Sequence, residues 1–291
     1  FTDMPGVQQH FNLPAKAIDD DFFVNGQLFD GSSIRGFQGI AESDMQLIPD
    51  VQSAYVDPFR IEKTLVIICS IVNPRTGEPY HRDPRGVAER AEAYLQSTGI
   101  ADTAFFASEA EFFVFEDVRY QVEPNSVFYK IDSDEAPWNT GRKEEGGNLG
   151  NKTPVKGGYF PVSPVDKQAD LRDAMCVALD EVGLEVERSH HEVGAAGQAE
   201  INYKFDTLTK AADDLLKFKY VIKGTADAWG KSVTFMPKPV FGDNGSGMHC
   251  HQSLWQNGEP LFYDERGYAN LSDTARWYIG GLIEHSSAVL A

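Results

Sequence analysis

Carboxylates interrupt two segments that are otherwise typical of buried β-strands. Glu109 and Glu111 lie two residues apart within TAFFASEAEFFVF. Glu200 lies within QAEINYKF, and Glu192 precedes it across a loop of small residues. Side chains two residues apart on a strand share a face, so the first two acids are expected to project together. Burying unpaired carboxylates is costly, so they must meet a cation or reach solvent. For the first pair alone, a half-exposed polar face is an equally good interpretation.

A third candidate strand carries histidines. The segment FGDNGSGMHCHQSLW begins as a polar, glycine-rich loop and becomes apolar after His-Cys-His. Strand alternation places His249, His251 and Ser253 on one face. It sends Cys250 to the opposite face, which we expect to belong to the core. The sequence therefore predicts a strand with one functional face.

The candidate metal ligands are carboxylates and one imidazole: Glu109, Glu111, Glu192, Glu200 and His249. Hard oxygen ligands suit Mg²⁺ or Mn²⁺ far better than structural Zn²⁺, which favours cysteine and histidine. The adjacent His190 and His191 would point in opposite directions on a strand, so at most one can face the acids. Taken alone, each is better explained as a loop or core histidine.

The loop from Asn244 to Gly247 has the composition to offer backbone N–H groups to an anion. It is not a Walker A loop, because no Gly-Lys-Ser/Thr follows it. Magnesium sites usually retain waters and hold substrate phosphates. The residues by themselves predict a divalent-cation site that handles a phosphorylated substrate, with phosphoryl transfer favoured over metal-assisted hydrolysis.

The chain has 291 residues, with 44 acidic and 26 basic side chains and a formal net charge of -18. This charge argues against binding nucleic acid or an anionic membrane through bulk electrostatics. Only three cysteines are present, which favours a reducing compartment, and all three are expected to be core thiols. No apolar run is long enough to span a membrane or to form a signal-peptide core. We expect a cytoplasmic protein.

The pattern of elements predicts an α+β chain with two domains, a mostly β domain at 1–82 and a second domain at 83–291. Asp83, Pro84 and Gly99 have the spacing of a helix N-cap, first position and C-cap. The expected helices are at 83–99, near 169–182, near 208–229 and after Ser272. Residues 120–157 are polar and rich in glycine, asparagine and lysine, and we expect a long loop there.

Five motifs resemble successive signatures of the bacterial type I glutamine synthetases: FDGSSIRGF, SEAEFFVF, GGYFPVSPVD, HHEVGAAGQAE and FMPKPVFGDNGSGMHCHQSL. They occur in the family order between Phe29 and Ser253. The resemblance implies a β-grasp-like N-terminal domain followed by a glutamine synthetase/guanido kinase-like catalytic domain with an open, funnel-like antiparallel sheet. It also implies a homo-oligomer, a dodecamer of two hexameric rings with sites shared between subunits. A short N-terminal segment and the part after Ala291 are missing by this comparison, so we expect a fragment.

The resemblance implies roles for individual residues. The first-metal positions are matched by Glu111, Glu192 and Glu200. Two second-metal positions are matched by Glu109 and His249, and the family takes a third carboxylate from the part after Ala291. The glutamate-binding segment is matched by Asn244 and Gly245, and the ATP-contacting positions by Glu187, His251 and Ser253. The acid that takes a proton from ammonium is matched by Asp30, with Ser33 beside it.

The implied reaction is ATP-dependent ligation of ammonia to L-glutamate through γ-glutamyl phosphate, with two or more Mg²⁺ or Mn²⁺ ions per site. Two alternatives remain open. A γ-glutamyl-polyamine ligase would share the fold, although the FDGSS motif with Asp30 favours ammonia as the acceptor. A catalytically inactive structural or regulatory relative should have lost ligands, whereas every metal position within this chain is intact.

Overall fold

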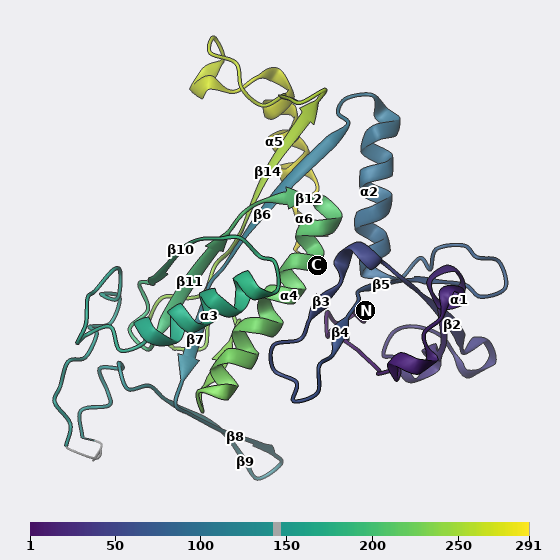
Figure 1. The fold of residues 1–291 in the computed structure, drawn as a ribbon. Coiled ribbons are helices and arrows are strands. Elements are labelled where there is room, and N and C mark those ends of the chain that lie inside the picture. The colour runs from purple at the N-terminus through teal and green to yellow at the C-terminus, as the bar shows by residue number, and fades with distance from the viewer. Residues whose placement is uncertain (142–146, 291) are drawn as a thin grey trace.

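The computed structural model describes residues 1–141 and 147–290 (Figure 1). The N-terminal part contains a short helix and two small antiparallel sheets, in strand orders β1-β2-β5 and β3-β4. Its elements are α1 (Asp20–Asn25), β1 (Gln27–Asp30), β2 (Asp44–Pro49), β3 (Tyr55–Val56), β4 (Leu65–Val66) and β5 (Cys69–Val72). The buried core of this part is formed by Phe37, Met45, Leu47, Ile71 and Tyr80. The expected β character of this segment is confirmed.

Helix α2 (Pro84–Thr98) begins and ends where the sequence predicts. The carboxylate of Asp83 accepts a hydrogen bond from the backbone N–H of Arg85, and Gly99 closes the helix in the left-handed region at φ 71°. Asp83 also accepts a 3.0 Å hydrogen bond from the N–H of Ile71 in β5. One buried side chain therefore caps α2 and ties it to the N-terminal sheet.

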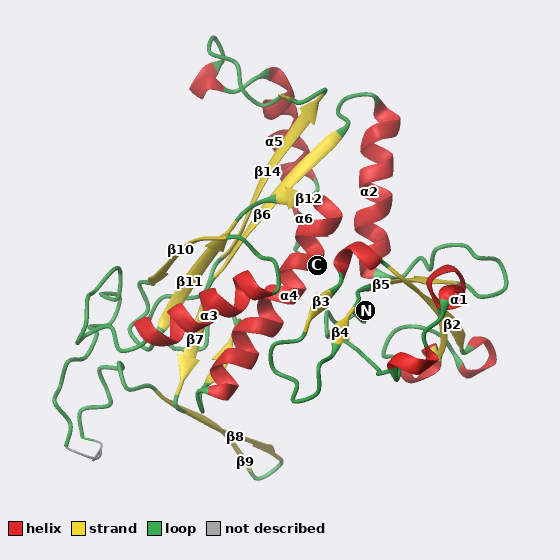
Figure 2. Cartoon of the chain, in the orientation of Figure 1, coloured by secondary structure: helices red, strands yellow, loops and turns green. Residues whose placement is uncertain are grey.

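Two four-stranded antiparallel sheets follow, in strand orders β12-β6-β14-β15 and β10-β11-β7-β13 (Figure 2). The strands of the first are β6 (Thr103–Ala110), β12 (Asp206–Thr207), β14 (Met248–Gln256) and β15 (Glu259–Pro260). Those of the second are β7 (Phe112–Phe115), β10 (Val186–His191), β11 (Gln198–Tyr203) and β13 (Ser232–Thr234). Only Glu111 separates β6 from β7, so the chain passes from one sheet to the other at that residue.

Helices α3 (Ala169–Glu181) and α4 (Leu208–Ala228) form the helical layer and pack against strands of both sheets (Figure 1). Between the helices and strands lies the largest core cluster, which includes Phe112, Met175, Ile201, Phe218 and Ile222. In β11, alternate residues Ala199, Ile201 and Tyr203 belong to this core. The remaining side chains of β11 consequently face the other way.

A buried ion pair joins Arg172 of α3 to Asp166, which precedes the helix. The Arg172 guanidinium donates to Asp166 at 2.5 Å, and both side chains are only 7% exposed. Burial raises the pKa of Asp166, but the hydrogen bond and charge of Arg172 outweigh burial, and the pKa is lowered.

The predicted loop over 120–157 is wrong in its first part. The hairpin β8 (Asp117–Glu123) and β9 (Ser126–Asp132) extends away from the body of the molecule (Figure 1). Its strands alternate apolar and polar residues, a period-2 signal that the polar composition of the segment obscured. The apolar face comprises Val118, Tyr120, Val122, Val127, Tyr129 and Ile131. Within that predicted loop, residues 142–146 lie outside the described part.

The last elements are α5 (Asp273–Glu284) and α6 (Ser286–Val289). The predicted N-cap is confirmed, because the Ser272 hydroxyl accepts a 3.1 Å hydrogen bond from the N–H of Ala275. Among the described residues, no helix combines the length and apolar character needed to cross a membrane.

The expectation that all three cysteines are core thiols is wrong for Cys250, which is exposed, while Cys69 and Cys176 are partly buried. On the same face of β14, the Tyr278 hydroxyl of α5 donates to the side chain of Gln252. Leu254, further along, is buried. Cys250 is nevertheless exposed, so alternation gives its face correctly but not its burial.

Candidate active site

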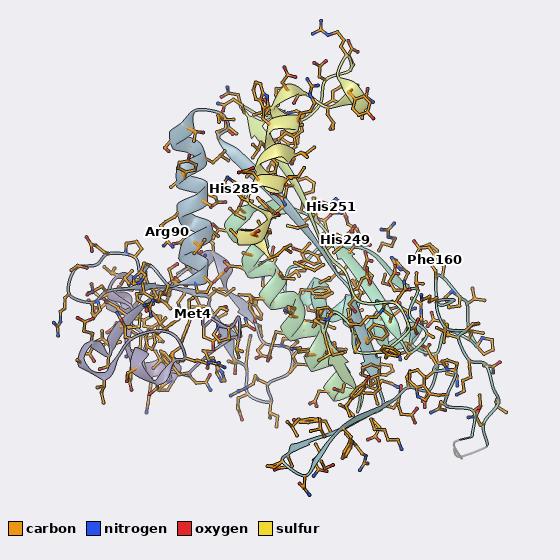
Figure 3. The ribbon with its side chains drawn as sticks, turned by 180° about the vertical axis from the view of Figure 1, so that it is seen from behind. Met4, Arg90, Phe160, His249, His251 and His285 are labelled. Carbon is orange, nitrogen blue, oxygen red and sulfur yellow. The ribbon has the colours of Figure 1, made fainter. Side chains whose placement is uncertain are left out.

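A carboxylate and two histidines meet across β6 and β14. Register places His249 directly opposite Glu109, and His249 Nδ1 lies 3.2 Å from Glu109 Oε2. His251 Nε2 lies 3.1 Å from the other carboxylate oxygen of Glu109. Partial burial raises the pKa of Glu109, but the hydrogen bonds from His251 and then His249 outweigh it, and the pKa is lowered. The predicted histidine face is confirmed, and Figure 3 shows both histidines along β14.

A second group forms where β10 meets β11. His190 lies opposite Glu200 in the β-ladder, and His190, Glu192 and Glu200 offer ligand atoms that all lie within 4.8 Å of one another. The sequence interpretation gave no ligand role to His190. The signal that could have found it is strand alternation, since His190 and Glu192 are two residues apart in a segment that leads from β10 into the loop.

His191 faces the opposite way and is buried. Its Nδ1 donates to the carbonyl oxygen of Glu192 at 2.6 Å, because a carbonyl can only accept. Its Nε2 lies 2.9 Å from the buried carboxylate of Glu135. Burial lowers the pKa of His191, but the hydrogen bond and charge of Glu135 outweigh burial, and the pKa is raised. His191 thus anchors the backbone behind the ligand group.

Glu111 joins the two groups. Its pKa is raised, first by burial and then by the neighbouring charges of Glu192 and Glu200. A Cβ atom added to Gly247 would lie 2.9 Å from Glu111 Oε1 and 3.0 Å from His249 Nε2. The missing side chain of Gly247 therefore leaves a space that both a carboxylate and an imidazole border. Crowded carboxylates with imidazoles around such a space fit divalent cations by their donor chemistry.

The loop that carries Asn244 and Gly245 is held by a residue that the sequence interpretation missed. Asp243 is 2% exposed, and its carboxylate accepts hydrogen bonds from the backbone N–H groups of Lys156, Ala195 and Asn244 at 2.8–3.0 Å. Gly245 cannot carry a side chain, because a Cβ would lie 2.5 Å from the carbonyl oxygen of Pro237. No local sequence pattern reveals Asp243, since its partners come from two distant segments.

The other predicted positions lie on the same strands. Ser253 shares the histidine face of β14, and its Oγ accepts a 3.0 Å hydrogen bond from the indole N–H of Trp255. Glu187 is exposed at an irregularity of β10, where the register shifts between Val186 and Arg188. Such bulges often re-aim a side chain beside a site.

Asp30 and Ser33 are not brought to this group within one chain. Asp30 ends β1 and accepts hydrogen bonds from the N–H and hydroxyl of Ser32 and from the hydroxyl of Ser33, at 2.6–2.9 Å. These bonds, led by that from the Ser32 side chain, lower the pKa of Asp30. Figure 3 shows the N-terminal part, marked by Met4, apart from His249 and His251.

Comparison with protein families decides the assignment of the chain. The family model described as "Glutamine synthetase, catalytic domain" matches residues 81–291, and "Glutamine synthetase, beta-Grasp domain" matches residues 1–74. The chain belongs to the glutamine synthetase family. The expected fold, a β-grasp domain followed by a glutamine synthetase catalytic domain with antiparallel sheets, is confirmed. Catalysis in this family depends on ATP and divalent metals.

Individual relatives agree with this assignment. The chain is 64% identical over its whole length to glutamine synthetase of Streptomyces coelicolor and 59% identical to that of Mycolicibacterium smegmatis. It spans 61% and 62% of those two proteins. The cryo-electron microscopy structure of Plasmodium falciparum glutamine synthetase superimposes with a TM-score of 0.89 at 29% identity. That match covers 98% of this chain and 56% of the other.

Proposed function

We propose that the full-length protein ligates ammonia to L-glutamate with ATP as co-substrate, giving L-glutamine through γ-glutamyl phosphate. The observation that carries the proposal is the meeting of two ligand groups at Gly247, Glu111 with Glu192 and Glu200 on one side and His249 with Glu109 on the other. Two adjoining cation sites beside an anion-binding loop suit transfer of a phosphoryl group.

In this proposal each site holds two or more Mg²⁺ or Mn²⁺ ions. Glu111, Glu192 and Glu200 hold one ion, with His190 beside them, and Glu109 and His249 hold a second. When bound, the cations neutralise negative charge on the transferring phosphoryl group. Two of these carboxylates are held in place by side-chain amides of β11: Gln198 donates to Glu111, and Asn202 donates to Glu200.

The loop at Asn244 and Gly245 binds glutamate and points its γ-carboxylate at ATP, whose contacts are His251, Ser253 and Glu187. A carboxylate oxygen attacks the terminal phosphorus, the bond to the bridging oxygen breaks, and ADP leaves. The loop suits this task because Asp243 fixes its backbone before substrate arrives, which reduces the entropy lost on binding.

In the second step, the nitrogen of ammonia attacks the phosphorylated carbonyl carbon and phosphate leaves. Asp30, with Ser33 beside it, accepts the proton that ammonium gives up. An aspartate carboxylate is ionised at neutral pH, so Asp30 attracts the ammonium cation. The hydroxyl groups of Ser32 and Ser33 hold both carboxylate oxygens in place.

Asp30 ends β1 in the N-terminal part, which lies apart from His249 and His251 of its own chain (Figure 3). We therefore propose that it serves a neighbouring subunit. The proposed assembly is a homo-oligomer, a dodecamer of two hexameric rings. The hairpin β8–β9 supports assembly, because an isolated two-stranded ribbon is marginal in water. Tyr120, Val122 and Val127 on its apolar face are 75–77% exposed. The three free cysteines favour a cytoplasmic location.

The test is formation of γ-glutamyl hydroxamate by the full-length protein from L-glutamate, ATP, Mg²⁺ and hydroxylamine. Glu192→Ala should abolish it, because the variant loses a ligand. Glu185→Ala should keep wild-type activity, since Glu185 is an exposed acid whose ion-pair partner is Lys204. ADP release with a polyamine but not with ammonia would identify the polyamine ligase instead. A folded wild type without either activity would identify an inactive relative.

A further inference from the structure

The face of β11 opposite the core alternates amide, carboxylate and amide: Gln198, Glu200 and Asn202. These side chains are buried, with exposed fractions of 0%, 6% and 7%. Buried amides must be fully hydrogen-bonded, because each unpaired donor or acceptor costs about 1–3 kcal/mol. Their partners therefore show what each amide holds in place.

Gln198 connects three segments that are distant in sequence. Its Nε2 donates to Glu111 Oε2 and to the carbonyl oxygen of Gly245, both at 2.9 Å. Its Oε1 accepts from the N–H of Gly194 at 2.7 Å. The orientation of the amide is fixed by these partners, since a carboxylate and a carbonyl only accept and an N–H only donates. The two hydrogens of one NH₂ group thus hold a metal ligand and the loop proposed to bind glutamate.

Asn202 holds a carboxylate without touching that loop. Its Nδ2 donates to Glu200 Oε1 at 2.6 Å, and its Oδ1 accepts from Arg188 Nε at 3.0 Å. Both of its partners lie in the β10–β11 pair. Asn202 and Gln198 therefore act on ligands of the same group, but only Gln198 extends to Gly245.

We propose that Gln198 is a positioning residue that couples cation binding at Glu111 to the binding of the amino-acid substrate at Gly245. The inference rests on the proposed function. A cation that fixes Glu111 also fixes the NH₂ group, and the second hydrogen of that group then holds the Gly245 carbonyl. Binding at either end consequently orders the other, and the coupling must be reciprocal.

The experiment measures binding without ATP, so that no turnover occurs. In the full-length protein, Mn²⁺ binding is followed by electron paramagnetic resonance and L-glutamate binding by calorimetry, each with and without the other ligand. Gln198→Met removes the side-chain hydrogen bonds to Gly194, Glu111 and Gly245, and a longer one to Ser246 Oγ, at similar volume. Asn202→Leu is the matched control, because it removes an amide from Glu200 on the same face of the same strand.

Wild type should bind glutamate about 5–150-fold more tightly with saturating Mn²⁺, the usual range for coupled sites. Both variants should bind Mn²⁺ about 10–100-fold more weakly, as loss of a group that orients a ligand does. In Gln198→Met, saturating Mn²⁺ should change the affinity for glutamate by no more than about twofold. In Asn202→Leu, Mn²⁺ should strengthen glutamate binding as much as it does in wild type. Mn²⁺ should also slow hydrogen exchange at 243–247 in wild type and Asn202→Leu but not in Gln198→Met.

Equal coupling in wild type and Gln198→Met, or equal loss in Asn202→Leu, would overturn the inference. If Gln198→Met does not fold, the isosteric Gln198→Glu provides the same comparison, because it cannot donate to both acceptors. Wild type that binds Mn²⁺ and glutamate independently refutes the coupling and leaves the ligase assignment intact. Wild type that binds neither refutes both.

Discussion

Replacing Gly247 with alanine should weaken metal binding without destabilising the metal-free protein. The added Cβ would lie 2.9 Å from Glu111 Oε1 and 3.0 Å from His249 Nε2, closer than carbon normally approaches either atom. Both obstructing atoms are ends of side chains, so they can move, and the backbone need not. Metal–ligand distances tolerate only about 0.2 Å, so a ligand displaced by several tenths of an ångström is lost or strained.

The magnitude follows from linkage between binding and unfolding. At a Mn²⁺ concentration 100 times its Kd, binding stabilises the wild type by about 2.7 kcal/mol. If Gly247→Ala weakens binding about 100-fold, the same concentration equals the new Kd and contributes only about 0.4 kcal/mol. Without metal the variant should be as stable as wild type or gain about 0.4–1 kcal/mol, because alanine restricts the unfolded chain.

The assay is thermal unfolding of the full-length protein across a Mn²⁺ titration. Gly280→Ala is the control, since a Cβ there meets no atom within 4 Å. The control should retain the whole Mn²⁺-dependent rise in Tm, and Gly247→Ala should lose most of it. If Gly247→Ala shows the same rise as wild type, the space beside Gly247 is not where the cation ligands converge.

Four further predictions concern other parts of the chain. His249→Ala should strongly weaken the binding of metal–ATP, whereas Cys250→Ala should keep near wild-type kinetics. Nucleotide titration and turnover measurements would show this. An equal loss of turnover in both variants would contradict the assignment of the two residues to opposite faces of β14. Asp30→Ala should still release ADP slowly, with glutamine formation reduced about 10²-fold, as expected for a lost general base. Mixed oligomers of Asp30→Ala and Glu200→Ala subunits should recover activity, and mixed oligomers no more active than either parent would exclude shared sites. Asp166→Asn should lower the free energy of unfolding at pH 7. Because the pKa of Asp166 is lowered in the folded protein, this loss should shrink as the pH falls below about 4. Urea unfolding at several pH values would measure it.

Local signals were sufficient for much of the fold. Asp83, Pro84 and Gly99 predicted the limits of α2 because caps act within one turn of a helix. The histidine face of β14 followed from alternation, which needs no knowledge of neighbouring strands. The hairpin β8–β9 was missed because polar residues alternate with its apolar ones, and the composition of the segment outweighed that alternation.

Residues whose roles depend on distant partners were not predictable in this way. Alternation could place His190 on the side of Glu192, but only the register between β10 and β11 sets it opposite Glu200. Gln198 and Asp243 connect segments far apart in the chain. The prediction that Cys250 is buried was wrong for the same reason. Alternation shows which face of the strand a residue is on, and only neighbouring elements decide whether that face is covered. The roles proposed for Asp30 and Ser33 stay predictions, because they depend on a second subunit.

Because a single residue connects β6 to β7, the relative positions of Glu109 and Glu111 depend on how the two sheets are held against each other. Any shear between the two sheets must be absorbed at Glu111, and it would shift this carboxylate relative to Glu109. Helix α4 limits such shear, because it packs against β6 of one sheet and β13 of the other. Phe218 of α4 contacts Phe112 and Phe235 edge-on in that core. The spacing of the two proposed cation sites would therefore be set partly by aromatic packing on the far side of the sheets.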